Sequence, residues 1–170
     1  LGNRSIIADP RRADMVRQLN EKIKHREFFR PFAASVLEEK APMWFEINRA
    51  SLAQRFMLLA YPVQKDKLGQ VPAVTHVDGT TRIQTVSRAI NPVYYDIISA
   101  FDKLTGVPLL LNTSFNDQEP IVCTPENAIE TALRACVDFL VMERLLIDLN
   151  QVRDSVGAPA QSTLSDFLFD

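Results

Sequence analysis

The pattern of apolar and polar residues along the chain alternates between short runs that suit strands and longer runs that suit helices. Short apolar or alternating runs bounded by polar turns are typical of buried or half-buried strands. On this pattern we expect strands at residues 5–8, 33–37, 55–63, 71–77, 81–86, 107–111 and 121–123, and a late pair at 139–142 and 145–149 that can form a hairpin.

A polar residue followed by proline opens three longer runs, in which apolar residues recur at helical spacing. Asp9, Asn91 and Thr124 each stand before a proline, as an N-cap stands before the first helical residue. The helices are expected to end near Lys22, Gly106 and Ala135. Strands mixed with such helices predict an α/β domain built on one sheet, with some antiparallel pairing.

The balance of charge narrows the classes of partner. The 170 residues include 19 Lys and Arg against 21 Asp and Glu, so the formal net charge is −2. General nucleic-acid and membrane-surface binders carry an excess of basic side chains, so this balance argues against both. No apolar run approaches the ~20 residues that span a bilayer. We therefore expect one globular domain that binds neither nucleic acid nor membrane.

The two cysteines and the chain ends give weaker signals. Cys123 and Cys136 stand in apolar sequence surroundings, and their spacing fits no metal motif, so we expect buried thiols in a reducing cytoplasm. The first residue is not Met, which suggests a piece of a longer polypeptide. Residues 150–170 are rich in Gln, Ser, Gly, Pro and Ala, and are interpreted as a tail that is flexible or packs on another domain.

Any phosphate bound by this chain must be held by side chains, because the sequence has five glycines and no glycine-rich phosphate loop. The segment 24–30 offers suitable groups in Lys24, His25, Arg26 and Arg30. In a strand, Lys24 and Arg26 would share one face, where two cations repel each other unless an anion lies between them. The alternatives are a loop at a site edge or a solvated charged surface.

Two further segments carry polar groups beside apolar runs. His76 and Arg82 flank a turn, and each suits a pocket or a purely structural role. Asn112, Ser114 and Asn116 follow a buried strand, and ligands in open α/β sheets bind outside the carboxyl ends of strands. A polar turn that hydrogen-bonds to its own backbone is the alternative. No base that could activate Ser114 is identifiable, so a binding role is favoured over nucleophilic catalysis.

Six segments in unbroken order resemble the C-terminal domain of the carbamoyltransferases, a family that includes nodulation-factor enzymes and enzymes that tailor antibiotics. The segments are Leu1–Arg11, Lys24–Ala33, Pro72–Thr80, Arg82–Val86, Leu110–Asn116 and Glu119–Val122. The resemblance implies a YrdC-like α/β domain over residues 1–149, with a twisted, mixed sheet, flanking helices and a concave basic face. It leaves out the tail at 150–170 and implies an N-terminal, actin-like ATPase-type domain that is absent from this chain.

The same resemblance implies a reaction and a set of site residues. The domain would convert carbamoyl phosphate and ATP, with Mg²⁺, to carbamoyladenylate, and the N-terminal domain, with bound iron, would pass the carbamoyl group to an acceptor hydroxyl. A Lys-x-Arg pair and a Ser/Asn loop hold nucleotide in YrdC-like proteins. Catalytic roles are therefore predicted for Lys24, Arg26, Arg82 and Ser114, and binding roles for Asn112, Thr113, Asn116, Arg30 and His76.

The chemistry of these residues agrees with the implied reaction. Carbamoyl phosphate and ATP are both polyanions, so cations must neutralise them before one can react with the other. No metal ligand is expected within the chain. Two other interpretations stay open: a YrdC-like module that binds nucleotide or RNA without catalysis, and a domain that only stabilises its partner domain.

Overall fold

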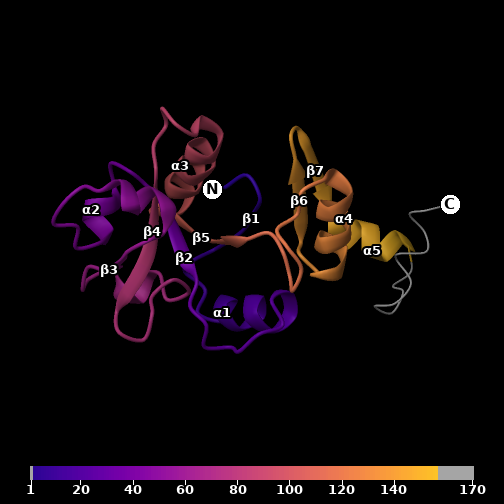
Figure 1. Ribbon diagram of the computed structural model, residues 1–170, viewed down its shortest axis with the longest axis horizontal. Coiled ribbons are helices and arrows are strands. Elements are labelled where there is room, and N and C mark those ends of the chain that lie inside the picture. The colour runs from indigo at the N-terminus through magenta and orange to yellow at the C-terminus, as the bar shows by residue number, and fades with distance from the viewer. Residues whose placement is uncertain (1, 157–170) are drawn as a thin grey trace. The chain divides into compact units, whose positions relative to one another are not determined.

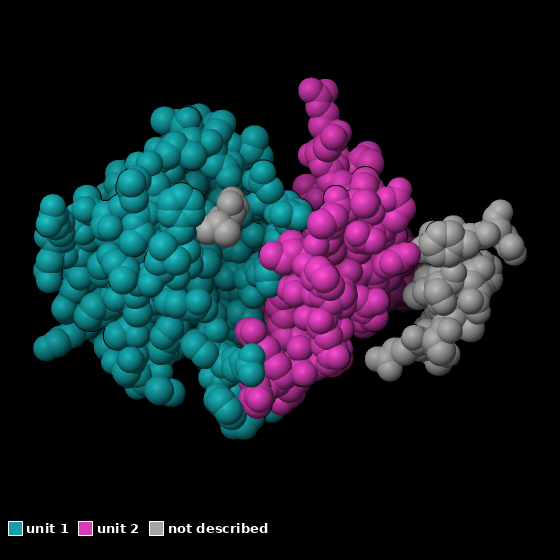
Figure 2. All heavy atoms as spheres, viewed as in Figure 1, with its two compact units in different colours: residues 1–18, 28–114 teal, residues 19–27, 115–170 magenta. Residues whose placement is uncertain are grey.

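The computed structural model describes residues 2–156 of the 170-residue chain, with its elements labelled in Figure 1. The chain divides into two compact units, coloured separately in Figure 2. Unit 1 comprises residues 1–18 and 28–114, and unit 2 comprises residues 19–27 and 115–170. The chain therefore leaves unit 1 for nine residues after α1 (Met15–Gln18) before it returns.

Unit 1 is built on a five-stranded mixed sheet with strand order β1-β5-β2-β4-β3. The strands are β1 (Ser5–Ala8), β2 (Ala33–Leu37), β3 (Ala60–Pro62), β4 (Thr80–Val86) and β5 (Leu109–Ser114). β2 and β4 run parallel, and the other neighbours run antiparallel. This mixed sheet with helices confirms the predicted α/β class.

The longest helix of the described chain, α3 (Pro92–Thr105), begins and ends where its local sequence directs. The Asn91 side chain accepts a hydrogen bond of 3.2 Å from the backbone N–H of Tyr94, and proline occupies the first turn. Gly106 ends the helix with φ +76°, a left-handed conformation that glycine adopts without steric cost. Both ends confirm the prediction made from Asn91 and Gly106.

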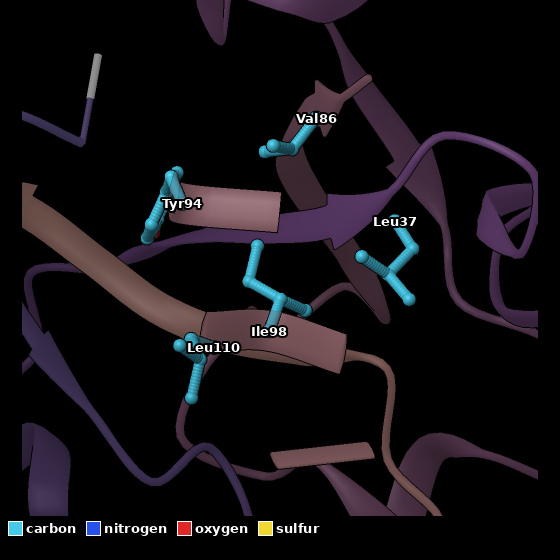
Figure 3. Packing of buried hydrophobic residues seen from close by; sticks show 5 residues of the cluster. All are labelled: Leu37, Val86, Tyr94, Ile98 and Leu110. Atoms are coloured by element: carbon cyan, nitrogen blue, oxygen red, sulfur yellow. The ribbon is translucent and has the colours of Figure 1, made fainter. Parts of the chain in front are cut away.

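The core of unit 1 lies where α3 covers the central strands. Tyr94 and Ile98 of the helix pack against Leu37 of β2, Val86 of β4 and Leu110 of β5 (Figure 3). All five side chains are at most 5% exposed. Because side chains alternate along a strand, every second residue counted from Leu37, Val86 and Leu110 lies on the same face of the sheet, the face that α3 covers.

Short helices replace several of the expected elements. The predicted helix at Asp9 is wrong at its start: the Asp9 carboxylate accepts bonds from the backbone N–H and the guanidinium of Arg11, and the helix begins only at Met15. The described part of unit 1 also contains α2 (Ala41–Trp44) and the 3₁₀ helices η2 (Leu52–Phe56) and η3 (Leu68–Gln70).

Three predicted strands are also wrong. Residues 55–63 form the end of η2 and the short edge strand β3, because a capping box at Ser51 starts a helix and Met57 then turns at φ +56°. Residues 71–77 form turns, in which the Thr75 hydroxyl donates to the carbonyl of Val71 at 2.9 Å. The side chains of Val71, Ala73 and Val74 are buried nonetheless, which explains the strand-like pattern, whereas Val77 is exposed. Residues 121–123 form no strand with any other residue of the described range 2–156.

The described part of unit 2 contains helices and one hairpin. Its elements are the π-helix η1 (Leu19–Ile23), α4 (Pro125–Arg134), β6 (Phe139–Met142), β7 (Leu145–Asp148) and α5 (Leu149–Val156). The predicted hairpin is confirmed by the antiparallel pairing of β6 with β7. The helix at Thr124 is confirmed as well, because its hydroxyl accepts from the backbone N–H of Asn127.

The remaining expectations concern the tail and the cysteines. The first residues assigned to the tail, up to Val156, are helical, and residues 157–170 lie outside the described part of the chain. Cys123 and Cys136 are both exposed free thiols, so the prediction of buried thiols is wrong; they stand at either end of α4, where the chain enters and leaves the helix. No helix in residues 2–156 is long and apolar enough to cross a membrane.

Candidate functional site

The strand register of unit 1 brings Arg82, Asn112 and Ser114 to one face of the sheet. Ala33 on β2 pairs with Asn112 on β5. Ala34 pairs with Ile83 on β4, so Ala33 lies beside Arg82 one residue earlier. Neighbouring strands are about 4.8 Å apart, which puts the backbones of Arg82 and Asn112 about 10 Å apart. Ser114 follows two residues after Asn112 on the same face.

The accessibility of these side chains differs. Arg82 is exposed and Ser114 is half-buried, so both can be reached at this end of the sheet. Thr113 is half-buried too, but alternation directs it to the opposite face of β5. Arg30 is exposed on the segment that leads into β2.

His76 lies near the same sheet end, in the turn that leads into β4. Its Nε2 is 3.3 Å from the carbonyl oxygen of Phe32, and its Nδ1 is 3.4 Å from the hydroxyl of Thr80. Both ring nitrogens therefore have neighbours that belong to the ends of β2 and β4. This geometry gives His76 a structural task, that of joining the starts of two parallel strands.

Asn112 is committed to a buried network. Its side-chain nitrogen donates to Ser35 Oγ at 2.8 Å and to Gln84 Oε1 at 3.0 Å, and Ser35 Oγ donates to Gln84 Oε1 at 2.7 Å. The three residues are 3%, 0% and 6% exposed, respectively. The network therefore joins β5, β2 and β4 on the face that α3 covers.

A buried tyrosine hydroxyl lies beside this network. Burial raises the pKa of Tyr94 to about 12, and the nearby Ser35 and Asn112 offset the rise only in part. Neither neighbour meets the geometry of a hydrogen bond, so within the described residues the hydroxyl has no partner. A contact that is too long or bent contributes little, so the Tyr94 hydroxyl gains little from these two neighbours.

Unit 2 holds a buried lysine whose ammonium is hydrogen-bonded to a residue of the same unit. Lys24 is 6% exposed, and its ammonium donates to the carbonyl oxygen of Asn116 at 2.6 Å and to Oδ1 of the same residue at 2.9 Å. Burial lowers the pKa of Lys24 from 10.5 to about 8, and the charge of Arg26 adds to this, while Asp117 and Glu119 oppose it. Lys24 is thus a desolvated cation close to a second cation.

The segment around Lys24 is a loop and not a strand, the two conformations that the sequence left open. Residues 24–27 form no strand, and His25 has a φ of +43°. The strand geometry that would place Lys24 and Arg26 on one face is therefore wrong. Arg26 is instead held by Asn20, whose buried Oδ1 accepts from the guanidinium Nε at 2.7 Å. The electrostatic effect on the Lys24 pKa still indicates that the two cations lie close together.

Acidic groups surround the loop that holds Asn116. The Asn116 amide donates to the carbonyl oxygen of Glu119 at 2.8 Å, and the Glu119 carboxylate accepts from Thr131 and Arg134 of α4. Burial would raise the pKa of the Glu119 carboxylate, but hydrogen bonds from its own backbone and from Thr131, together with the Arg134 charge, lower it overall. Asp117 lies between His25 at 3.7 Å and Arg134 at 3.9 Å.

A surface hollow in unit 1 lies apart from the candidate residues. It has a volume of about 530 Å³ and is lined by residues 46, 48–51, 59, 61 and 62. None of the residues predicted from the sequence contributes to its wall. The hollow is wide and open, and we place the candidate chemistry at the sheet end and at Lys24 on the basis of side-chain geometry instead.

The structure thus brings the predicted residues together in two groups, one in each unit. Arg82, Ser114 and His76 gather at one end of the sheet, and Lys24, Arg26 and Asn116 gather in unit 2. Sequence reasoning missed the polar residues that support both groups: Ser35, Gln84, Tyr94, Asn20, Asp117, Glu119, Thr131 and Arg134. The polar Ser35 and Gln84 within apolar strands were the available signal, because buried polar groups need partners.

The fold and these groups define an α/β chain with two clusters of cationic and amide side chains, as suits a protein that binds anions. Comparison with known families agrees: residues 1–148 match the family described as Carbamoyltransferase C-terminus. The chain therefore belongs to this family, and the resemblance noted in the sequence is confirmed.

Individual relatives support this membership. The chain is 51% identical over 148 residues to nodulation protein NolNO of Sinorhizobium fredii, and 49% identical over 148 residues to nodulation protein NolO of Bradyrhizobium diazoefficiens. Nodulation protein U of Rhizobium tropici is 40% identical over 116 residues. These alignments cover 86%, 86% and 68% of this chain but only 22%, 27% and 20% of the relatives, so the chain spans about a quarter of their length or less.

Proposed function

We propose that this chain is the part of an O-carbamoyltransferase that forms carbamoyladenylate from carbamoyl phosphate and ATP. The observation that carries the proposal is membership of the carbamoyltransferase C-terminus family over residues 1–148. The buried cation Lys24 and the position of Arg82 and Ser114 on one sheet face support it, because both substrates are polyanions. The cytoplasm, where both substrates occur, is the proposed location.

The proposed reaction has two bond changes. Water cleaves carbamoyl phosphate to carbamate and inorganic phosphate. An oxygen of the carbamate then attacks the α-phosphorus of ATP, and the bond from that phosphorus to the oxygen bridging to the β-phosphorus breaks, so that pyrophosphate leaves with the electron pair. No protein nucleophile is needed, which suits a chain whose candidate residues are cations, amides and a hydroxyl. The protein has to neutralise charge and hold the two reactants in line.

In unit 2, Lys24 and Arg26 are proposed to bind a phosphate group of a substrate. Each cation is held in place by an amide side chain, Lys24 by Asn116 and Arg26 by Asn20. Lys24 is buried and Arg26 is half-buried, so their mutual repulsion is unfavourable alone, and a phosphate dianion between them would relieve it. Asn116 is proposed to contribute to substrate binding by holding Lys24 and the loop up to Glu119 in place.

In unit 1, Arg82 and Ser114 are proposed to contact the carbamoyl phosphate. Arg82 can clamp two phosphate oxygens with its planar guanidinium, and the Ser114 hydroxyl can donate to a third without adding charge. Thr113, Arg30 and His76 remain proposed binding residues. Asn112 was predicted to bind as well, but its amide nitrogen already makes two hydrogen bonds within the protein.

Two metals belong to the proposal. Mg²⁺ would enter with the triphosphate, whose oxygens it neutralises, and needs no cage of protein ligands. The iron is proposed to bind in the N-terminal domain of the same polypeptide, as the family resemblance implies. That domain is also proposed to bind the acceptor and to complete the transfer.

The test is release of inorganic phosphate from carbamoyl phosphate by the full-length protein, with and without ATP. With ATP present, we expect pyrophosphate in an amount equal to the phosphate released, because each carbamate formed then displaces pyrophosphate from one ATP. Ser114→Ala is expected to lower the rate by about tenfold to a hundredfold, as loss of about 1.4–2.7 kcal/mol of transition-state binding would. Phosphate release without pyrophosphate when ATP is present would reject the proposed reaction, and wild-type turnover in Ser114→Ala would reject the proposed role of Ser114.

A further inference from the structure

Three polar side chains form a closed ring of hydrogen bonds inside unit 1, and no role in binding accounts for it. Ser35, Gln84 and Asn112 come from β2, β4 and β5, which are neighbours in the sheet. The ring uses both hydrogens of the Asn112 nitrogen, the hydroxyl of Ser35 and one oxygen of Gln84. Because buried polar groups are costly unless they are paired, such a ring tolerates little movement of its strands.

The members of the ring are placed two residues inside the candidate residues of the same unit. On β4, Gln84 follows Arg82 by two positions, and on β5, Asn112 precedes Ser114 by two positions. Side chains two apart on a strand share a face, so the ring lies directly beneath the pair that is proposed to contact carbamoyl phosphate. Ser35 occupies β2, the strand between them.

We propose that Ser35, Gln84 and Asn112 are positioning residues that fix the distance between Arg82 and Ser114. An apolar contact between strands tolerates small sliding, whereas directed hydrogen bonds across three strands set both spacing and register. The inference rests on the proposed function for the roles of Arg82 and Ser114. It assigns Asn112 an indirect role in place of the direct binding expected from the sequence.

A pair of isosteric substitutions tests the ring directly. Asn112→Asp replaces the nitrogen that donates twice with an oxygen, which then faces Ser35 Oγ and Gln84 Oε1 without a hydrogen to share. Gln84→Glu keeps an acceptor oxygen at the position that receives both bonds. The two variants add the same formal change, amide to carboxyl, but only the first removes the donors that close the ring.

The expected result is a difference in turnover in the full-length protein. Pyrophosphate release that depends on carbamoyl phosphate should fall by about tenfold to a hundredfold in kcat for Asn112→Asp, and by no more than about threefold for Gln84→Glu. The control is Thr85→Val, which alters a buried residue on the opposite face of β4 and should leave kcat within about twofold. Equal losses in all three variants would overturn the proposal, since general damage to the core would explain them.

Coupling to Arg82 separates positioning from stability. If the ring acts through Arg82, then the fold loss in kcat caused by Asn112→Asp is at least threefold smaller in an Arg82→Ala background than in the unmodified protein. Effects that multiply independently would contradict the proposal. If Asn112→Asp does not fold, Ser35→Ala removes one donor and one acceptor from the ring with less disturbance and is read in the same way.

A second measurement does not depend on catalysis. Hydrogen–deuterium exchange of the backbone amides of Thr113 and Ser114 should become faster in Asn112→Asp and remain unchanged in Thr85→Val. If the unmodified protein shows no reaction with carbamoyl phosphate, the proposed function fails, yet this exchange still decides whether the ring fixes the end of β5. Unchanged exchange in Asn112→Asp would overturn the positioning role.

Discussion

Replacement of Lys24 by methionine is expected to change how stability depends on pH. Methionine has a similar length and no charge, so Lys24→Met removes the buried amine with little change in volume. The pKa of Lys24 lies at about 8 in the folded chain, against 10.5 for an ordinary lysine. This difference corresponds to about 3 kcal/mol between the protonated and neutral forms.

The sign of the effect follows from the protons bound in each state. Below about pH 8 both the folded and the unfolded chain carry a protonated Lys24, and the folded chain bears the full cost of burying the charge. Between pH 8 and 10.5 the folded chain releases the proton while the unfolded chain keeps it, so the free energy of unfolding rises with pH. Lys24 therefore contributes a gain of about 3 kcal/mol over that range.

The assay compares urea unfolding of the wild-type and Lys24→Met proteins from pH 7 to pH 10.5, followed by far-ultraviolet circular dichroism. Tyrosines and other groups that titrate in this range affect both proteins and cancel in the difference. Hydrogen–deuterium exchange in α4 adds a reading that belongs to unit 2 alone. Lys22→Met removes an exposed lysine of η1 and serves as the matched control.

We expect the wild-type protein to gain about 3 kcal/mol relative to Lys24→Met as the pH rises, with no such gain relative to Lys22→Met. At pH 7 the Lys24→Met protein should still fold, because it no longer bears the cost of burying a charge. It should nevertheless be inactive, since the buried charge serves binding rather than folding. A difference between wild type and Lys24→Met that stays constant with pH would refute the reasoning, because the amine would then not be desolvated.

Three further substitutions test the packing and the caps. Gly2→Ala should destabilise the protein by at least about 1 kcal/mol in urea unfolding, because Gly2 has φ +92° and a Cβ there would lie 2.6 Å from the Tyr94 ring; an unchanged midpoint would contradict this close approach. Thr124→Ala should cost about 1 kcal/mol through loss of the cap on α4, with Thr124→Ser as the control that retains it. Tyr94→Phe should leave stability unchanged or slightly higher, because its hydroxyl is buried without a partner; a loss above about 1 kcal/mol in thermal unfolding would reveal a hydrogen bond.

The elements that could be predicted from the sequence are those specified by local signals. Asn91 and Gly106 mark both ends of α3, and the uninterrupted apolar run at Val107–Leu111 indicates a buried strand, which β5 extends to Ser114. Residues 55–63 misled the prediction because their apolar side chains suggest burial, while Phe56 is in fact 59% exposed. Whether an apolar side chain is covered depends on distant segments, and the local pattern does not contain that information.

The candidate site shows the same division. Lys24, Arg26, Arg82 and Ser114 could be selected from the sequence because they combine the required chemistry with a family motif. The ring of Ser35, Gln84 and Asn112 could not, since its members are separated by up to 77 positions and meet only through the strand order β5-β2-β4. The loop conformation at His25, with its positive φ, was likewise not predicted, because the local sequence was equally compatible with a strand.

The most direct test of the proposed function is exchange of labelled pyrophosphate into ATP by the full-length protein. Exchange requires that pyrophosphate and an adenylate form reversibly, so it reports formation of carbamoyladenylate without any acceptor. The account predicts exchange that appears only when carbamoyl phosphate is present and that falls at least tenfold in Arg82→Ala, the expected cost of losing a hydrogen bond to a charged group. Exchange without carbamoyl phosphate, or consumption of carbamoyl phosphate with no exchange at all, would contradict it.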